Sequence, residues 1–266
     1  MNKQTLTTKQ QQIILLLYRF RFLSTYHIQK FLQHTNPTRI QTWLQELTQN
    51  NYTISDYSRS SFEQNTKPAT YCLASKSKKV IQEKTGENHT NLKYIYSEKN
   101  RSNTFKEHCL TLANIGINFL YQDNNTKTTK HFFTKVDMAA YDYFPDPLPD
   151  AYIAIKEAEK TKRYYLTLFD EKTPRFAMRA RIKQYITYVE EEHWKKHTDQ
   201  PLPLILVVCH DEQKRRYLYR FIKVALNDSF LNDLSFFLAI KQDILKHGLQ
   251  SNIWQKVGIF DKKNNE

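Results

Sequence analysis

Two carboxylates and a lysine near the middle of the chain have the spacing of a metal-dependent hydrolytic site. Asp150 follows a proline and opens a run of β-forming residues, and Asp170-Glu-Lys172 closes a second such run. Carboxylates at the ends of adjacent strands can hold Mg²⁺, and a nearby lysine can orient or activate the attacking water. If the site is active, the pattern predicts Asp150 and Asp170 as metal ligands. It then predicts Asp150, Asp170 and Lys172 as catalytic residues and Mg²⁺ as the cofactor.

The residues around this pattern predict the elements that would position it. Strands are expected at 131–136, 150–155, 163–169 and 203–209, with a charged turn at 156–162, a helix from Thr173-Pro174 and a basic helix over 213–226. The strand at 203–209 is apolar throughout, which is typical of a sheet covered on both faces. Strand, strand, helix, strand, helix indicates α/β organisation. Pro149-Asp150 followed by Asp170-x-Lys172 resembles the outline of the PD-(D/E)XK nuclease fold.

The N-terminal third contains a helix with one apolar and one polar face. Asn36 can cap this helix through its side chain, and Pro37 suits the first helical position, where no N–H is needed. The apolar residues recur at helical spacing: Ile40, Trp43, Leu44 and Leu47. The opposite face offers side chains that reach base edges and phosphates: Thr38, Arg39, Gln41, Thr42 and Gln45. The pattern predicts a recognition helix, although an ordinary amphipathic surface helix would look the same alone.

The neighbouring segments favour the recognition helix. Helices are expected from Thr7 or Thr8 and from Ser24 or Thr25, so that three helices with short turns form a helix-turn-helix core. Runs of β-formers at 52–59 and 67–73 predict a hairpin, and a short helix at 76–85 ends at Gly86. The hairpin would be a wing, with Arg59 and Lys67 as its candidate phosphate contacts.

Composition narrows the class of protein. The net charge of +13 is concentrated in residues 1–100, which hold 14 Lys and Arg against 6 Asp and Glu, as phosphate contact requires. Four glycines leave no glycine-rich phosphate loop. The three cysteines have no zinc spacing and suggest buried thiols in a reducing cytoplasm. We expect a cytoplasmic protein, since no apolar run reaches the length of a membrane span.

The order of these motifs resembles the replication-relaxation family of plasmid and mobile-element proteins. The similar features are Leu6-Thr-Thr, the apolar run at 14–17, Leu23-Ser-Thr, Arg39, Leu44 and Leu47, and the hairpin closing on Tyr71-Cys-Leu. The resemblance continues at His108-Cys-Leu-Thr-Leu-Ala-Asn114 and over 148–190. It implies DNA binding linked to plasmid replication, relaxation, nicking or mobilisation, with a replication initiator or relaxase as a further partner.

The chain departs from the family pattern at the second strand. That pattern has Glu-x-Asp-x-x-Thr, whereas this chain has Leu168-Phe-Asp170-Glu-Lys-Thr173. The family's helix lysine falls at Arg181, and its tyrosine falls at Tyr185. Arginine stays protonated and is a poor general base. On this alignment the site is degenerate, whereas on the direct Asp170-Glu-Lys172 alignment it is complete.

We therefore expect an α+β chain with an N-terminal winged helix-turn-helix at 1–86 and a linker at 87–103. An α/β domain resembling the PD-(D/E)XK nuclease fold should follow at 104–260, with a tail at 261–266. The expected function is double-stranded DNA binding with a degenerate nuclease-like domain. An active Mg²⁺-dependent nuclease or nickase, a winged-helix transcriptional regulator and a protein-binding winged helix are the alternatives. A homodimer is left open, and no membrane partner is expected.

Overall fold

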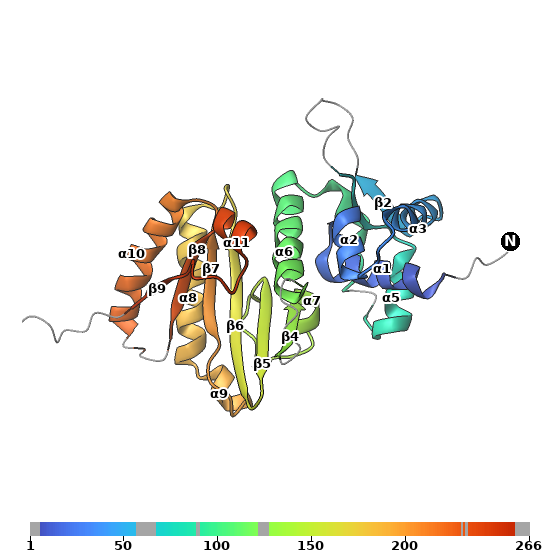
Figure 1. Cartoon of the computed structure of the whole chain (residues 1–266). Helices are drawn as coiled ribbons and strands as arrows, with labels where there is room; N and C mark the ends of the chain where they lie inside the picture. The colour runs from blue at the N-terminus through green and yellow to red at the C-terminus, as the bar shows by residue number, and fades with distance from the viewer. Residues whose placement is uncertain are drawn as a thin grey trace, which may run out of the picture. The chain divides into compact units, whose positions relative to one another are not determined.

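The computed structural model describes residues 6–56, 68–88, 91–121, 128–229, 231 and 234–258, which form helices and two sheets (Figure 1). The chain divides into two compact units, Met1–Ile117 and Asn118–Glu266. The expected boundaries at residues 86 and 103 differ from this division, and α6 (Asn103–Tyr121) spans it. The fold is a mixture of helices and β-sheet, as the sequence predicts.

Three helices open the first unit, and their caps are those that the sequence predicts. They are α1 (Thr8–Phe20), α2 (Thr25–Phe31) and α3 (Pro37–Gln49). Thr7 and Ser24 both form capping boxes, and the Asn36 side chain accepts a hydrogen bond from the N–H of Arg39 at 3.2 Å. Each cap satisfies backbone donors that have no partner within the helix, which fixes where each helix begins.

A small antiparallel sheet accompanies the helices. Its strands are β1 (Leu23–Ser24), β2 (Thr53–Asp56) and β3 (Thr70–Leu73), in the order β1-β3-β2. The hairpin expected at 52–59 and 67–73 is present as β2 and β3 within the described residues. β1 was not predicted, because two residues between helices give no periodicity to detect. The helix α5 (Ser77–Thr85) ends at Gly86, whose φ of 73° suits glycine.

The segment expected as a linker contains structure of its own. A 3-10 helix, η1, covers Lys93–Asn100, and its Ile95 and Glu98 are buried. The Arg21 guanidinium donates to both oxygens of Glu98, at 2.7 and 2.5 Å, and stacks on Tyr94 at 4.3 Å. η1 is therefore packed against the end of α1. The polar composition of 87–103 gives no sign of this packing. It depends on Glu98, which pairs with a residue 77 positions earlier in the chain.

The second unit is built on a mixed sheet with the order β4-β5-β6-β7-β8-β9. β5 (Ala151–Glu157) lies between β4 (Thr128–Thr134) and β6 (Lys160–Phe169) and is antiparallel to both. β7 (Leu204–Cys209) and β8 (Phe236–Ile240) continue the sheet in parallel with β6, and β9 (Gln255–Val257) pairs antiparallel with β8. The charged turn expected at 156–162 is shorter than predicted, because Glu157 pairs with Lys160.

Two long helices cover one face of this sheet. They are α8 (Arg175–Glu190) and α10 (Glu212–Ser229), which lie beside the sheet in Figure 1. Their buried residues share one core with the facing side chains of the strands: Tyr165, Phe169, Met178, Ile182, Tyr185, Ile205, Val207, Leu218, Ile222, Leu226, Phe236 and Leu238. Alternate residues of β6 and β7 thus point into this layer, as strand geometry requires. This core holds both helices in place.

Shorter helices complete the second unit. α7 (Lys135–Met138) follows β4 directly, where the sequence predicted that the strand would run to Val136. The strand stops because the Asp137 side chain accepts hydrogen bonds from the N–H and hydroxyl of Thr134, at 2.7 and 3.0 Å. α9 (His193–His197) follows α8, and α11 (Lys241–His247) follows β8. Among the described residues, no helix has the length and apolar character needed to cross a membrane.

Candidate functional site

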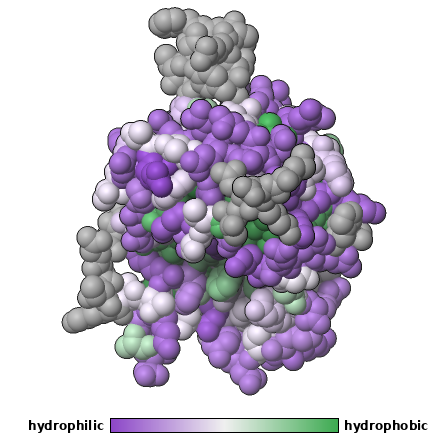
Figure 2. Space-filling view, turned by 90° about the vertical axis from the view of Figure 1, so that its right-hand side faces the viewer, coloured by the Kyte–Doolittle hydropathy of each residue, from purple (hydrophilic) through white to green (hydrophobic). Residues whose placement is uncertain are grey.

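The polar face of α3 is the first candidate site. Ile40, Trp43, Leu44 and Leu47 are buried, so the residues between them must face outward. Thr38, Arg39, Gln41 and Gln45 are exposed, and Thr42 is partly exposed with its hydroxyl donating to the Thr38 carbonyl at 3.1 Å. Figure 2 shows the side of the molecule to which α3 belongs in Figure 1, and its surface is mainly hydrophilic. The predicted candidates on α3 therefore share one accessible helix face.

The charge on this face is set by two side-chain contacts. The carboxylate of Glu46, the one acid of α3, accepts a hydrogen bond from the Gln10 side chain of α1 at 2.6 Å. The Arg39 guanidinium lies over the Trp43 ring at 5.4 Å from its centroid. The acid is thus engaged by α1, whereas the cation is held on the exposed side. The face presents one cation beside neutral hydrogen-bonding groups, which is compatible with phosphates and base edges.

The two residues of the hairpin that the sequence predicts as phosphate contacts cannot be placed in the candidate site. The candidate contacts Arg59 and Lys67 lie outside the described residues. At the end of β2, Asp56 forms an ion pair with Lys106 of α6, at 2.5 Å. Lys106 is mostly buried and Asp56 is partly exposed. This pair stabilises the base of the hairpin, because each charge has a partner at hydrogen-bonding distance.

Asp150 is the best-defined member of the second candidate site. It lies immediately before β5 and is 7% exposed. One carboxylate oxygen accepts from the N–H of Leu168 at 2.8 Å, and the other pairs with Nζ of Lys135 at 2.7 Å. Its own N–H donates to the Leu166 carbonyl at 2.8 Å. Both oxygens of Asp150 therefore have protein partners, a backbone donor and a cation.

Asp170 and Lys172 lie beyond this position along the sheet. Ala151 pairs with Leu166, so Asp150 stands beside Thr167, and Asp170 is three residues farther along the strand direction, or roughly 10 Å. The N–H of Asp170 bonds to the Thr173 hydroxyl at 3.0 Å, and Lys172 is exposed. Among the described residues, no three His, Cys, Asp or Glu side chains form a group that could hold a metal ion. On β6, the Asp150 carboxylate is bonded to the backbone N–H of Leu168, whose side chain is not a metal ligand.

Arg181 and Tyr185 of α8 complete the surroundings of this position. The Tyr185 hydroxyl lies 2.7 Å from the hydroxyl of Thr167 and accepts from Arg181 at 3.0 Å. The Arg181 guanidinium also stacks on the Tyr185 ring at 4.4 Å and donates to the Pro147 carbonyl. Burial raises the pKa of Tyr185. Neither the Arg181 guanidinium nor the Tyr185 hydroxyl is suited to accept a proton at neutral pH. The hydrogen bonds that they form hold α8 against the strands.

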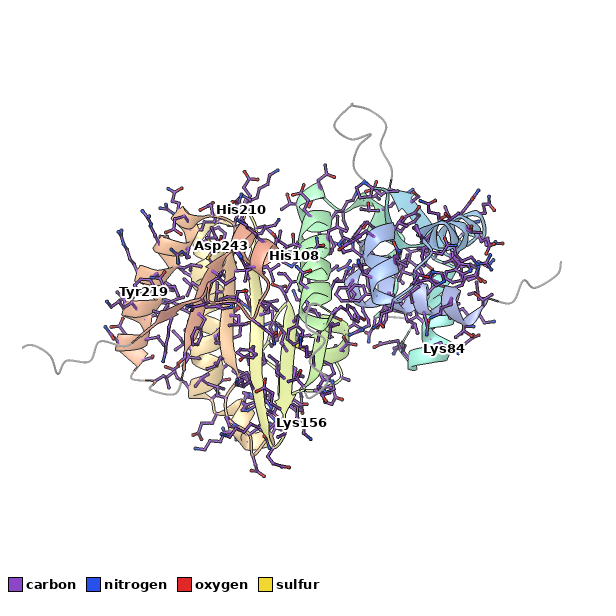
Figure 3. The ribbon with its side chains drawn as sticks, in the orientation of Figure 1. Lys84, His108, Lys156, His210, Tyr219 and Asp243 are labelled. Atoms are coloured by element: carbon purple, nitrogen blue, oxygen red, sulfur yellow. The ribbon has the colours of Figure 1, made fainter. Side chains whose placement is uncertain are left out.

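Sequence reasoning did not identify Lys135 as the partner of Asp150. Fifteen residues separate the two, and Lys135 lay inside a predicted strand. The signal in the sequence was Thr134-x-x-Asp137, a capping pattern that ends the strand and begins α7 at Lys135. His108, singled out by the family resemblance, lies partly buried on α6 (Figure 3).

Comparison with known proteins finds one structure to which the chain is similar. No protein-family model matches the chain, and no curated protein matches it. One solved structure, that of the restriction endonuclease FokI, is similar with 10% identity and a TM-score of 0.33. The match covers 90% of this chain, which spans 42% of the FokI chain.

Proposed function

We propose that this chain is a double-stranded DNA-binding protein whose first unit is a winged helix-turn-helix. The observation that carries the proposal is the exposed face of α3, where Arg39, Gln41, Thr42 and Gln45 are accessible and the one acid is engaged by α1. The arrangement of α2, a short turn and α3 beside the small antiparallel sheet supports the same interpretation. α3 would lie in the major groove, with Thr38 and Arg39 near its N-terminal end.

The second unit is proposed to be a nuclease-like domain of the PD-(D/E)XK type that has lost its chemistry. The partners of Asp150 support this view. Lys135 pairs with its carboxylate, and Leu168, which the family resemblance aligns with the second acid, offers Asp150 its backbone N–H. The role in plasmid or mobile-element replication, relaxation or mobilisation rests on the sequence resemblance alone, as does a replication initiator or relaxase as partner.

The proposal is tested by binding of the full chain to labelled duplex DNA fragments. Fluorescence anisotropy measures the affinity at low and moderate salt. The double variant Arg39→Ala/Gln45→Ala should bind roughly tenfold or more weakly, because one charged and one amide group that face the duplex are removed. Lys84→Ala on α5 removes the same charge from another exposed position and should have little effect (Figure 3). Equal affinities of the double variant and the wild type would refute the role of α3.

An active Mg²⁺-dependent nuclease is the alternative that Asp150 and Asp170-Glu-Lys172 keep open. Incubation of supercoiled plasmid with the protein and Mg²⁺ or Mn²⁺ distinguishes the two proposals. Loss of nicking in an Asp150→Ala/Asp170→Ala variant would assign the activity to this position. The degenerate site predicts intact plasmid with both proteins, while binding to the duplex persists.

A further inference from the structure

A groove between α8 and α10 is lined by arginines from both helices. We call it the arginine groove and define it by Arg175 and Arg179 of α8 and Arg216 and Arg220 of α10. Its volume is about 860 Å³, and Tyr217, Phe221 and Val224 supply its apolar surface. The groove lies wholly within the second unit, on the outer side of the two helices whose inner sides form the core.

The arginines form two rows along the groove. Arg175 and Arg179 are four residues apart on α8, and Arg216 and Arg220 are four residues apart on α10. Residues at this spacing lie on the same side of a helix, with a rise of about 6 Å between them. All four are exposed. Arg175 is held in place by stacking on the Tyr217 ring, 4.7 Å from its centroid. The groove thus offers an ordered array of guanidinium groups.

The positive charge of the groove is only partly neutralised. Glu212 is the one acid in the lining, and it accepts hydrogen bonds from Arg215 at 2.7 and 2.9 Å and from Arg216 at 2.7 Å. These bonds, first with Arg215 and then with Arg216, lower the pKa of Glu212 to about 2. No carboxylate in the described part of the chain pairs with Arg175, Arg179 or Arg220. The groove therefore has an excess of guanidinium groups that can bind an anion.

We infer that the arginine groove is a second DNA contact, which binds the phosphate backbone without reading bases. Guanidinium groups bind phosphate oxygens through paired hydrogen bonds. A duplex carries one charge per about 1.7 Å of its axis, a density that can engage both rows at once. This density favours DNA over an acidic protein segment. The inference rests on the proposed function in one respect only, since it takes the ligand to be DNA.

The experiment measures the affinity of the full chain for a labelled duplex as a function of salt concentration. The triple variant Arg175→Ala/Arg179→Ala/Arg220→Ala removes the three unneutralised arginines and leaves the bonds to Glu212 intact. The slope of log K against log salt should become shallower by about 0.9 for each phosphate that the variant no longer neutralises. Replacing the same arginines with lysine keeps the charges, so most of the slope should remain while affinity falls.

A matched control removes the same charge elsewhere in the second unit. Lys156, Lys160 and Lys256 are exposed and do not line the groove. In Figure 3, Lys156 lies by the β5–β6 hairpin, away from Tyr219 on α10. Their alanine variant should keep the wild-type salt slope. If both triple variants lower the slope equally, the effect is general charge and the groove inference is wrong.

The remaining outcomes separate this inference from the role of α3. An unchanged slope in the arginine variant, beside weakened binding in Arg39→Ala/Gln45→Ala, would overturn the groove alone. The reverse result would support the groove and refute α3. Failure of the wild type to bind duplex would overturn both. Tighter binding to a poly-glutamate peptide than to the duplex, abolished in the arginine variant, would replace DNA with an acidic protein partner.

Discussion

Asp150 illustrates how one carboxylate can serve structure instead of chemistry. Its side chain satisfies the N–H of Leu168 and pairs with Lys135. Asp150→Ala should lower the free energy of unfolding by about 1–3 kcal/mol, since a buried backbone donor loses its acceptor. Asp150→Asn keeps an oxygen for Leu168 and should cost less. Urea unfolding of both variants measures the difference.

The control for this prediction is Lys172→Ala, an exposed substitution that should change the free energy of unfolding by less than about 0.5 kcal/mol. A gain of stability in Asp150→Ala would contradict the structural role. Such a gain is the expected signature of a strained active-site carboxylate, because function there is maintained at a cost in stability. It would favour the active nuclease.

His27 gives the first unit a defined response to acid. It is 5% exposed, and its Nδ1 accepts from the N–H of Ser24 at 3.1 Å, so this nitrogen carries no proton. Burial lowers the pKa of His27 to about 4 from its ordinary value of 6.5, although the Asn114 side chain opposes the shift. Protonation would turn the acceptor into a donor and break the bond from the Ser24 N–H, one of the two bonds of the α2 capping box.

The sign of the pH effect follows from these two pKa values. Between pH 6.5 and 4 the unfolded chain binds more protons at this position than the folded chain. Stability should therefore fall as the pH is lowered through that range, with a loss on the order of 3 kcal/mol by about pH 4. Denaturant unfolding at several pH values measures it. His27→Gln keeps a neutral capping-box residue and should remove this component, whereas an unchanged pH profile would contradict it.

At the scale of elements, the sequence predicts best where a local rule decides. The caps at Thr7, Ser24 and Asn36 begin their helices because side-chain and backbone groups three residues apart satisfy each other. The apolar strand β7 is identifiable because both of its faces are covered. These features need no information from distant residues.

Elements defined by distant partners were not predictable in the same way. β1 exists because Leu23 and Ser24 pair with Tyr71 and Thr70. η1 is buried because Glu98 pairs with Arg21 across 77 positions. The candidate site shows the same limit, since the faces of α3 follow from periodicity, whereas the pairing of Asp150 with Lys135 depends on how β4, α7 and β5 come together.

At the scale of the whole molecule, the division of the chain depends on how η1 and the first part of α6 stabilise the first unit. Beyond the Arg21–Glu98 pair, Cys109 of α6 shares a buried cluster with Phe22 and Cys72, and Phe105 packs against that cluster. A domain ending at residue 86 would expose these groups to water. It would also leave Arg21 without its carboxylate.

A comparison of fragments tests this division. Residues 1–121, which keep α6 whole, should unfold cooperatively at a higher temperature than residues 1–86. The pair between Arg21 and the buried Glu98 alone should contribute about 1.5–3 kcal/mol, which is typical of hydrogen bonds to charged groups. Residues 1–102 keep η1 without α6 and should fall between the two. Circular dichroism measures the melting temperatures of the fragments. Equal melting temperatures for 1–86 and 1–121 would instead support the boundary predicted from composition. In that case the packing of the polar segment 87–103 against α1 would add nothing to the stability of the fold, as is expected of a linker.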